Sequence, residues 1–484
     1  MYRKPSKRQQ TIRLVVVYSV MVAAVLVLVS FVTLLMLGYR FNMDDGRLEQ
    51  YALLQFSSSP SGATVSIDGE PINSKTPNKA TVKSGIHDIK MWREGYKTWT
   101  KHVDIKPGTV KWITYPLLIP ERINIETVKT YEKVYSSLAS NDKEKILVQE
   151  DESKPIFSLV EIDSEKIQSS VLTIDQSIFS ASKKHSFKAD KWDSSNRYVI
   201  IKHTFDNKIE WLVLDTQNAN LTKNLTKIFN IPISTIDFVS SNGNRFYILS
   251  NGTIRELDLA SETISKSLID QVASFSYYEE SKAIAFRSKP NSKNLINLGI
   301  YVSGDERAAI INSVSNKNIN HIITSKYFNE NYIAISNGEN VTIMSGSYPT
   351  SNSDEANSLK EFTSFKLDYE VEQISFSPSG QYVLVVNDNK YATYDLEYQT
   401  LNQSTISQDK INQTMNFEWL DNNYLWSDNN NQLVIREFDG QNSHNINSVV
   451  TGQSVVMTKN ERYIYSFNQL DSKIHLQRAR IILP

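Results

Sequence analysis

Side chains that could catalyse a reaction or bind a metal ion are scattered along this sequence of 484 residues. The histidines form no H-E-x-x-H motif and no pair at the spacing of metal ligands on a helix. We therefore expect each histidine to be a surface residue or a core residue whose hydrogen bonds are satisfied. The seven histidines are His87, His102, His185, His203, His321, His444 and His475.

Other active-site motifs are also missing from the sequence. It has no P-loop, no G-x-G-x-x-G and no G-x-S-x-G element, so nothing marks a nucleotide site or a hydrolase serine. Cysteine does not occur, which excludes disulfides, thiolate metal sites, a cysteine nucleophile and a lipid-modified N-terminal cysteine. The sequence therefore predicts no catalytic residue, no cofactor-binding residue and no metal ligand.

Two acidic runs resemble fragments of calcium-binding loops. MDDG at 43–46 and SDNNN at 427–431 lack the spaced carboxylates and the closing Glu of an EF-hand, so we interpret both as turns. A carboxylate pair for glycoside chemistry stays open as an alternative, because an active site assembled from separate parts of a propeller leaves no local motif.

One apolar stretch fixes where these residues are displayed. Residues 14–37 contain no charge and only four polar side chains, those of Tyr18, Ser19, Ser30 and Thr33. As a helix the stretch is roughly 36 Å long, enough to cross a hydrocarbon core of about 30 Å. We interpret it as a membrane anchor. A cleaved signal peptide is the competing interpretation, but its apolar region is usually only about 7–15 residues long and ends at an A-x-A-like site.

Charges on either side of the stretch predict its orientation. The first 13 residues carry five basic residues and no acidic one, whereas the next segment carries only Arg40 and Arg47. The positive-inside rule then places the N-terminus in the cytoplasm and everything after Gly38 outside the cell. The five basic residues are Arg3, Lys4, Lys7, Arg8 and Arg13.

The charge of the remaining chain bears on its partners. Without the basic arm, 47 basic residues face 53 acidic ones, a net charge of about −6. Phosphate binding needs a positive surplus that this part lacks, so we expect no nucleic-acid partner.

Short strands separated by turn residues follow the apolar stretch. Asp68-Gly69 is a strong hairpin signal, and Trp99 to Ile105 alternates apolar and polar residues, as expected of a strand with one buried face. Residues 52–118 are therefore predicted to form a small antiparallel β-sandwich, joined to the membrane helix by a linker at 38–51.

The motifs of this unit are similar to those of the PEGA domain. PSGATVSIDG at 60–69, Thr76-Pro77, SGIH at 84–87 and EGY at 94–96 occur in the order of that family, with Ser61 in place of the family's Glu. The resemblance implies a non-catalytic β-sandwich module of an envelope protein. Trp92 and Tyr96 are expected to be core or rim aromatics, with carbohydrate stacking as the less favoured role.

The rest of the chain, residues 121–484, repeats one pattern. The clearest copy runs from Val371 to Thr400, with strands around the turn Pro378-Ser379-Gly380, and looser copies recur every 37 to 56 residues. Four short strands per copy predict a β-propeller of seven or eight blades. FSPSGQY at 376–382 resembles the turn of WD40-like (PD40-type) repeats. Closing the ring requires the first strand, near 123–128, to pair with the last, near 474–483.

The predicted protein is all-β apart from its N-terminal helix. Its expected order is a basic cytoplasmic arm (1–13), a transmembrane helix (14–37), a linker (38–51), a PEGA-like β-sandwich (52–118) and the propeller (121–484). The favoured function is a non-enzymatic, single-pass protein of the cell envelope whose propeller binds an envelope polysaccharide or a protein, without a cofactor. The alternative is an envelope glycan hydrolase or lyase that uses carboxylates in the propeller funnel.

Overall fold

A computed structural model describes residues 7–42, 46–163, 165–351, 358–388, 390–406 and 416–484. The chain forms two compact units that divide between Arg122 and Ile123. The first unit contains one long helix and a small sandwich. The second contains the repeated four-stranded sheets.

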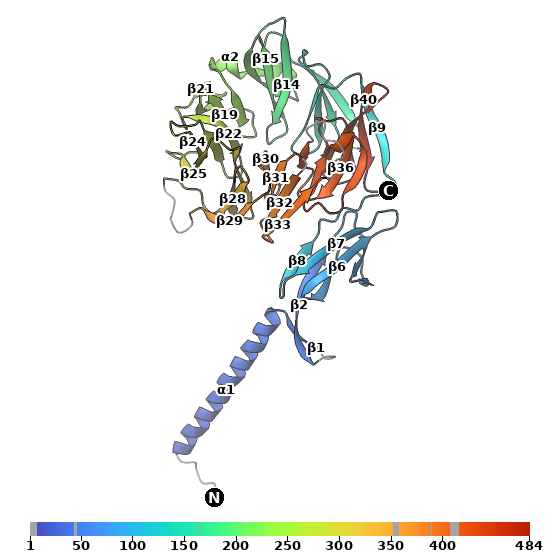
Figure 1. Ribbon diagram of the computed structural model, residues 1–484, viewed down its shortest axis with the longest axis vertical. Helices are drawn as coiled ribbons and strands as arrows, with labels where there is room; N and C mark the ends of the chain where they lie inside the picture. The colour runs from blue at the N-terminus through green and yellow to red at the C-terminus, as the bar shows by residue number, and fades with distance from the viewer. Residues whose placement is uncertain (1–6, 43–45, 164, 352–357, 389, 407–415) are drawn as a thin grey trace. The chain divides into compact units, whose positions relative to one another are not determined.

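Helix α1 (Lys7–Met36) covers the predicted membrane span except for its last residue, Leu37, and begins seven residues before it (Figure 1). Its segment Gln10–Met36 is long and apolar enough to cross a membrane, and its side chains are exposed along their whole length. The helix ends where Gly38, at φ +79°, adopts a left-handed conformation that favours glycine. Exposed apolar surface of this extent is typical of a helix that is surrounded by lipid.

The prediction of a linker at 38–51 is wrong. Strand β1 (Tyr39–Asn42) pairs antiparallel with the start of strand β2 (Arg47–Phe56), so this segment is a β-hairpin. β2 is long enough to pair with β1 through its first residues and with β5, a strand of the sandwich, through its last residues. Residues 43–45 of the acidic run MDDG lie outside the described residues, and Gly46 is exposed at the hairpin turn.

The sandwich of the first unit consists of two four-stranded sheets. One sheet joins β1 and β2 to β5 (Asn78–Lys83) and β8 (Val110–Ile113), and the other has the order β4 (Glu70–Pro71), β3 (Thr64–Ile67), β6 (Gly85–Trp92), β7 (Trp99–Ile105). The predicted strands are present, but the sandwich is not wholly antiparallel, because β2 pairs parallel with β8. Leu54, Ile89 and Trp99 are fully buried between the sheets.

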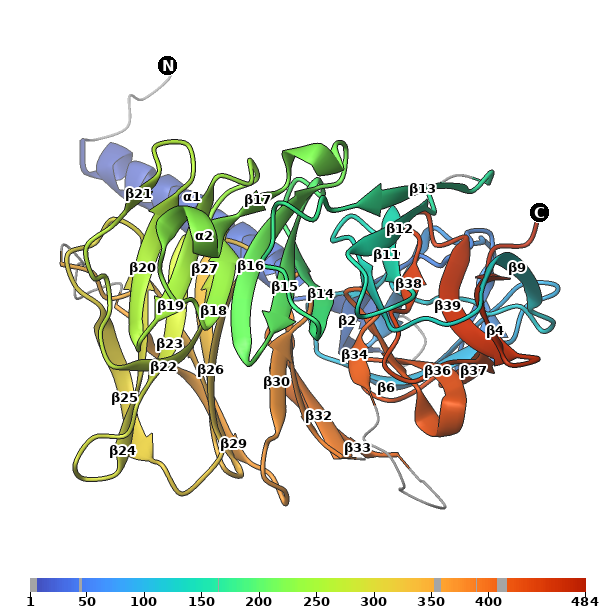
Figure 2. The same ribbon diagram turned by 90° about the horizontal axis from the view of Figure 1, so that it is seen from above.

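The second unit contains eight four-stranded antiparallel sheets among its described residues, which settles the blade number that the sequence left between seven and eight. In each blade the first strand lies nearest the middle of the ring and the last lies at the rim (Figure 1; Figure 2 shows the strands from the side). Blades 1 to 4 are β10 (Ser136–Ala139), β11 (Lys145–Gln149), β12 (Ile156–Glu161), β13 (Gln168–Thr173); β14 (His185–Trp192), β15 (Tyr198–Phe205), β16 (Lys208–Asp215), β17 (Lys223–Asn224); β18 (Thr235–Phe238), β19 (Arg245–Ser250), β20 (Thr253–Asp258), β21 (Thr263–Ile264); and β22 (Val272–Tyr278), β23 (Ala283–Ser288), β24 (Leu295–Val302), β25 (Ala309–Ser315). Blades 5 to 8 are β26 (Asn320–Tyr327), β27 (Glu330–Asn337), β28 (Asn340–Ser345), β29 (Lys360–Lys366); β30 (Gln373–Phe376), β31 (Tyr382–Asn387), β32 (Lys390–Asp395), β33 (Thr400–Thr405); β34 (Phe417–Trp419), β35 (Tyr424–Ser427), β36 (Gln432–Glu437), β37 (His444–Ser448); and β38 (Val456–Met457), β39 (Tyr463–Leu470), β40 (Lys473–Arg480), β9 (Asn124–Tyr131). A short helix, α2 (Leu225–Phe229), follows blade 2.

The ring closes as predicted, through a blade that both ends of the unit share. Strand β9 pairs antiparallel with β40, and Thr127 lies opposite Gln477. Apolar clusters fill the interfaces of neighbouring blades, and the closing blade packs on blade 1 through Leu476 and Tyr465. Between blades 7 and 8 the contact is partly polar, since the amide of Asn447 donates to Ser466 Oγ at 3.0 Å. The pairing of β9 with β40 supplies the fourth strand of the closing blade.

Candidate functional site

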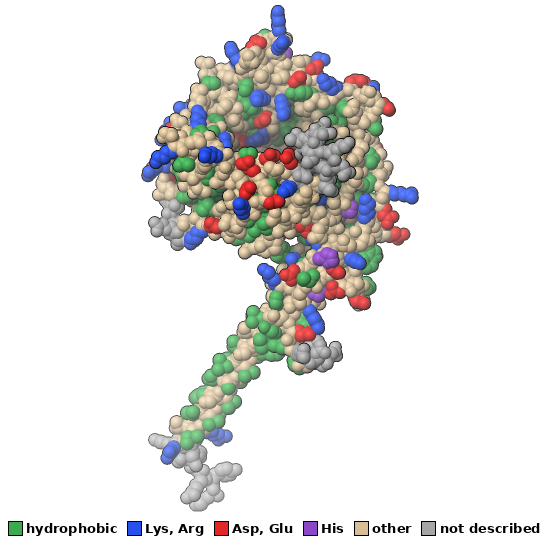
Figure 3. All heavy atoms as spheres, in the orientation of Figure 1, with side chains coloured by type: hydrophobic (Ala, Val, Ile, Leu, Met, Phe, Trp, Pro, Cys, Tyr) green, Lys and Arg blue, Asp and Glu red, His purple; other side chains and the backbone are tan. Residues whose placement is uncertain are grey.

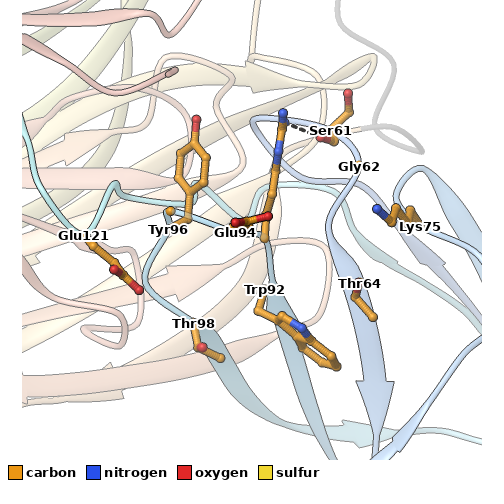
Figure 4. A pocket seen from close by; sticks show the side chains of 11 residues that line it. Ser61, Gly62, Thr64, Lys75, Trp92, Glu94, Tyr96, Thr98 and Glu121 are labelled. Atoms are coloured by element: carbon orange, nitrogen blue, oxygen red, sulfur yellow. Dashed lines mark hydrogen bonds between the residues drawn. The ribbon is translucent and has the colours of Figure 1, made fainter. Parts of the chain in front are cut away.

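A row of three side chains crosses one face of the sandwich in the first unit. Trp92, the last residue of β6, lies opposite Thr64 on β3, and Thr98 directly precedes β7 on the other side. Because side chains alternate along a strand, the preceding row, which includes Met91 and Trp99, points into the core. The indole of Trp92 remains 37% exposed between two threonine hydroxyls (Figure 4).

Charged residues surround this row and complete a pocket of about 840 Å³. The turn after β6 supplies Arg93, Glu94 and Tyr96, and Lys75 and Glu121 complete the rim (Figure 4). The guanidinium of Arg93 donates to the Ser61 carbonyl oxygen at 2.7 Å and lies 5.7 Å from the centre of the Tyr96 ring, which orders this side of the rim.

The pocket combines a flat aromatic surface with hydroxyl and charged groups. An indole face packs on the apolar side of a sugar ring, while hydroxyl, carboxylate and guanidinium groups bond to its hydroxyls. Both aromatics noted in the sequence line the pocket, but Tyr96 is only 5% exposed and packs as a core residue, whereas Trp92 is 37% exposed. Sequence reasoning missed Thr64 and Thr98, although the alternation within β3 and β6 places Thr64 and Trp92 on the same face.

At one end of the propeller ring, side chains reach across the middle. They come from the turns that join the first and second strands of each blade, here called the first turns. Lys143 Nζ of blade 1 donates to the Leu420 carbonyl oxygen of blade 7 at 2.6 Å, and Ser194 Oγ of blade 2 donates to Glu279 Oε1 of blade 4 at 3.2 Å. Burial lowers the pKa of Lys143, although Asp421 acts in the opposite direction. These bonds join blades that are not neighbours and so stiffen the ring.

Carboxylates on the innermost strands bear on the enzymatic alternative. Asp237 on β18 pairs with Lys191 Nζ at 2.6 Å, and burial raises the pKa of Asp237 despite this partner. Glu418 on β34 belongs to the exposed residues, but desolvation of its carboxyl group, and then the charge of Asp428, raise the pKa of Glu418. Among the described residues, no group of three or more His, Cys, Asp or Glu side chains is arranged to hold a metal ion.

Acidic side chains gather near the middle of the propeller face that is visible in Figure 3. The described acidic residues on the connections of blades 5 and 6 include Asp368, whose carboxylate bonds to Lys390 Nζ at 2.8 Å, and Glu370, which accepts from the backbone N–H of Ile319 at 2.8 Å. These two carboxylates are thus already engaged within the ring.

The acidic run SDNNN includes the end of β35 and a short 3₁₀ segment, Asn429–Asn431, in which Asn430 has a left-handed backbone conformation. Asp428 Oδ1 accepts from the backbone N–H of Asn416 at 2.7 Å, and its other oxygen accepts from the amide of Asn416 at 2.9 Å. Burial raises the pKa of Asp428 in spite of these bonds.

Two of the scattered histidines meet in blade 2. The register of β14 and β15 places Phe187 opposite His203 and His185 opposite Phe205, and the two imidazole centres are 5.6 Å apart. The ring of His203 is fully buried and stacks on Phe187 at 4.4 Å. Its Nδ1 bonds to Glu210 Oε2 at 3.2 Å.

The prediction that every histidine is a surface residue or a satisfied core residue is wrong for this pair. Nε2 of His203 and Nδ1 of His185 are buried without a hydrogen-bond partner among the described residues, and the same holds for Nε2 of His321 in blade 5. Burial lowers the pKa of His203, although Glu210 acts in the opposite direction. Burial alone would raise the pKa of Glu210, but hydrogen bonds, first those from Ser180, outweigh it and hold that pKa low. His203, whose lowered pKa favours its neutral form, thus lies beside a carboxyl group whose lowered pKa favours its charged form.

Comparisons with known proteins agree with this architecture. The family model of the PEGA domain matches residues 52–119. A search of curated proteins finds no match.

Solved structures similar to this chain include the Dos1 propeller, with 11% identity, a TM-score of 0.46 and coverage of 74% of this chain and 96% of that one. The Cps50 (Swd1) β-propeller of Myceliophteria thermophila has 11% identity and a TM-score of 0.41 over 68% of this chain and all of that one. An oligogalacturonate lyase in complex with manganese has 11% identity and a TM-score of 0.38 over 75% and 98%. At such low identity and TM-score these likenesses say nothing of function, and the fold rests on the strand pairing. Residues 52–119 are a PEGA domain, and a β-propeller follows it.

Proposed function

We propose that this chain is a non-enzymatic protein of the cell envelope that is anchored by α1 and binds an envelope polymer or a protein partner. The anchor is supported by the exposed apolar surface of Gln10–Met36. The orientation is supported by Arg8 and Arg13, which precede the apolar stretch and favour a cytoplasmic N-terminus. Both folded units then lie outside the cell.

The observation that best supports a polymer ligand is the exposed indole of Trp92, which lies between Thr64 and Thr98. An indole with this exposure inside a pocket of about 840 Å³ loses its contact with water when a sugar ring stacks on it. The rim carries both signs of charge, Lys75 and Arg93 against Glu94 and Glu121, so it offers donors and acceptors to hydroxyl groups. A hydroxyl-rich polysaccharide fits these groups.

The test compares Trp92→Ala with Trp112→Ala in the full-length chain, solubilised in detergent and sedimented with insoluble envelope polysaccharide. Trp92→Ala should weaken binding roughly tenfold, about 1.4 kcal/mol, as expected of an aromatic at the centre of a binding site. Trp112 lies on β8 and is 48% exposed, so its variant removes an even more accessible indole from the other sheet and should bind like the unmodified chain. Equal binding by all three proteins would contradict the polymer site.

The rigidity of the propeller also favours the binding of a partner. Hydrogen bonds between the first turns join blades that are not neighbours, so the loops around the ring are held in fixed positions. A preorganised surface loses little conformational entropy on binding, which suits a protein partner or an extended polymer.

A second candidate function is glycan cleavage in the propeller funnel. Glu418 favours it, because this residue is exposed on an innermost strand and its pKa is raised, which is the direction that a general acid requires. Release of reducing ends from envelope polysaccharide by the full-length chain, lost in Glu418→Gln, would establish this function. No release by the unmodified chain would leave the binding role.

A further inference from the structure

The hairpin formed by β1 and β2 begins immediately after the membrane helix. Gly38 follows the last turn of α1, where the backbone N–H of Leu37 donates to the Thr33 carbonyl oxygen at 2.9 Å. The Gly38 carbonyl oxygen in turn accepts from the backbone N–H of Tyr51 in β2 at 2.8 Å. One residue thus ends the helix and starts the sheet, and the hairpin has no free linker before it.

Close backbone packing holds this junction together. A Cβ atom at Gly108, in the turn between β7 and β8, would lie 2.8 Å from the Leu37 carbonyl oxygen, and one at Gly38 would collide with Gly108. The backbone N–H of Gly108 also donates to the Tyr51 carbonyl oxygen at 3.0 Å. The hairpin is therefore held at the level where the apolar helix ends, which is the membrane surface if α1 crosses the bilayer.

One face of the hairpin is apolar and exposed. Phe41 lies directly opposite Leu48, and residues opposite each other in an antiparallel pair point to the same side. Phe41 is 62% exposed and Leu48 is 50% exposed. Ile86 is a third exposed apolar side chain at this end of the unit, and 76% of its surface is accessible. The backbone N–H of Ser84, two residues before it, donates to the Gln50 carbonyl oxygen.

The other face of the hairpin is charged and occupied by the protein itself. Arg40 lies opposite Glu49, and its guanidinium is 5.8 Å from the centre of the Tyr51 ring. Glu49 accepts from Lys83 Nζ at 2.9 Å and from Tyr51 OH at 3.2 Å. The hairpin thus has one charged face bonded to Lys83 and one apolar face on the side of β2 that carries the core residues Ala52 and Leu54, where Leu48 nevertheless remains exposed.

We propose that the apolar face of this hairpin, Phe41 and Leu48, inserts into the interface of the lipid bilayer next to α1. The inference rests on the proposed membrane anchor. Apolar and aromatic side chains beside a charged face are the composition of elements that lie in the membrane interface, and direct continuity with α1 keeps these two side chains beside lipid. The contact would hold the PEGA domain against the membrane instead of letting it swing on a linker.

Single-cysteine labelling tests this directly, because the chain has no cysteine of its own. Phe41→Cys, Leu48→Cys, Val25→Cys and Lys75→Cys would each carry a nitroxide label in the full-length chain, reconstituted into phosphatidylethanolamine and phosphatidylglycerol vesicles. Val25 lies within α1 and reports whether the helix is inserted. Lys75 is exposed at the opposite end of the sandwich, beside the pocket.

Collision of each label with oxygen and with a water-soluble nickel complex gives its depth. We expect labels at 41 and 48 to be protected from nickel at least threefold relative to Lys75→Cys, and less than Val25→Cys. Nickel access at 41 and 48 equal to that at 75, with 25 protected, would overturn the hairpin inference and leave the anchor intact. Nickel access at 25 would overturn the anchor and the inference together.

Discussion

His203 makes the stability of the propeller depend on pH. Burial lowers its pKa in the folded protein, so below about pH 6.5 the unfolded chain takes up a proton that the folded chain does not. The contribution of neutral His203 to the free energy of unfolding is complete above about pH 6.5 and is lost as the pH falls. While His203 stays neutral in the fold, each pH unit below 6.5 costs up to about 1.4 kcal/mol.

This free energy corresponds to a measurable shift in melting temperature. For a unit the size of Ile123–Leu483 the entropy of unfolding is large, so about 1.4 kcal/mol lowers Tm by roughly 2 °C. The assay is thermal unfolding of the full-length chain in detergent at pH 8, 7, 6 and 5. Glu210, His185 and Lys227 act on His203, and other groups of the chain contribute to its overall pH dependence, so the comparison with a variant isolates His203.

His203→Phe removes the proton site and keeps an aromatic ring between Phe187 and Phe205, whose centres lie 4.4 and 4.9 Å from that of His203. Its Tm should fall less than that of the unmodified protein below pH 6.5, by roughly 2 °C per pH unit. The control Phe205→Leu disturbs the same stack and keeps the histidine. It should melt lower at every pH with the original pH dependence. Parallel pH profiles of His203→Phe and the unmodified protein would refute the reasoning.

Two further predictions concern the closing blade and the helix junction. Leu476→Ala should destabilise the propeller by about 2–5 kcal/mol, because this fully buried side chain packs where blade 8 meets blade 1, whereas Leu470→Ala, 46% exposed, should change the urea midpoint little. Gly38→Ala should lower the unfolding midpoint of the first unit, followed by tryptophan fluorescence, more than Gly46→Ala does. Both glycines have positive φ, but only at Gly38 would a Cβ atom meet backbone. Equal effects within either pair would contradict these contacts.

Local signals in the sequence were enough for the main elements. The uncharged stretch at 14–37 predicted the helix, since its length and composition leave no other stable state in a membrane. Asp68-Gly69 and Pro378-Ser379-Gly380 predicted turns that the structure contains, because glycine supplies the positive φ observed at Gly69 and Gly380. The PEGA motifs are turn and packing residues, so they predicted their domain well.

Features that depend on pairing across the chain could not be predicted in this way. The parallel contact of β2 with β8 joins segments about 57 residues apart, and no local pattern specifies it. The hairpin at 38–51 was missed because its first strand is only four residues long. His185 and His203 meet through a register that includes an irregularity between Ala189 and Lys191. Such positions emerge only when the strands are aligned.

Part of the pocket could be predicted from the sequence. The alternation of β6 places Trp92 on the face opposite Met91, so its exposure follows from the strand pattern. The partners of Trp92 required the register of β3 on β6, which pairs it with Thr64.

The most direct test of the central claim is the side of the membrane on which the propeller lies. Ser170→Cys, exposed on the rim strand β13, and Gln10→Cys, at the N-terminal end of α1, would each be treated in intact cells with a membrane-impermeant maleimide. The account predicts that Ser170→Cys in the full-length chain reacts at once and that Gln10→Cys reacts only after the cells are permeabilised. Labelling of Gln10→Cys in intact cells while Ser170→Cys stays protected would contradict the anchored, outward-facing propeller.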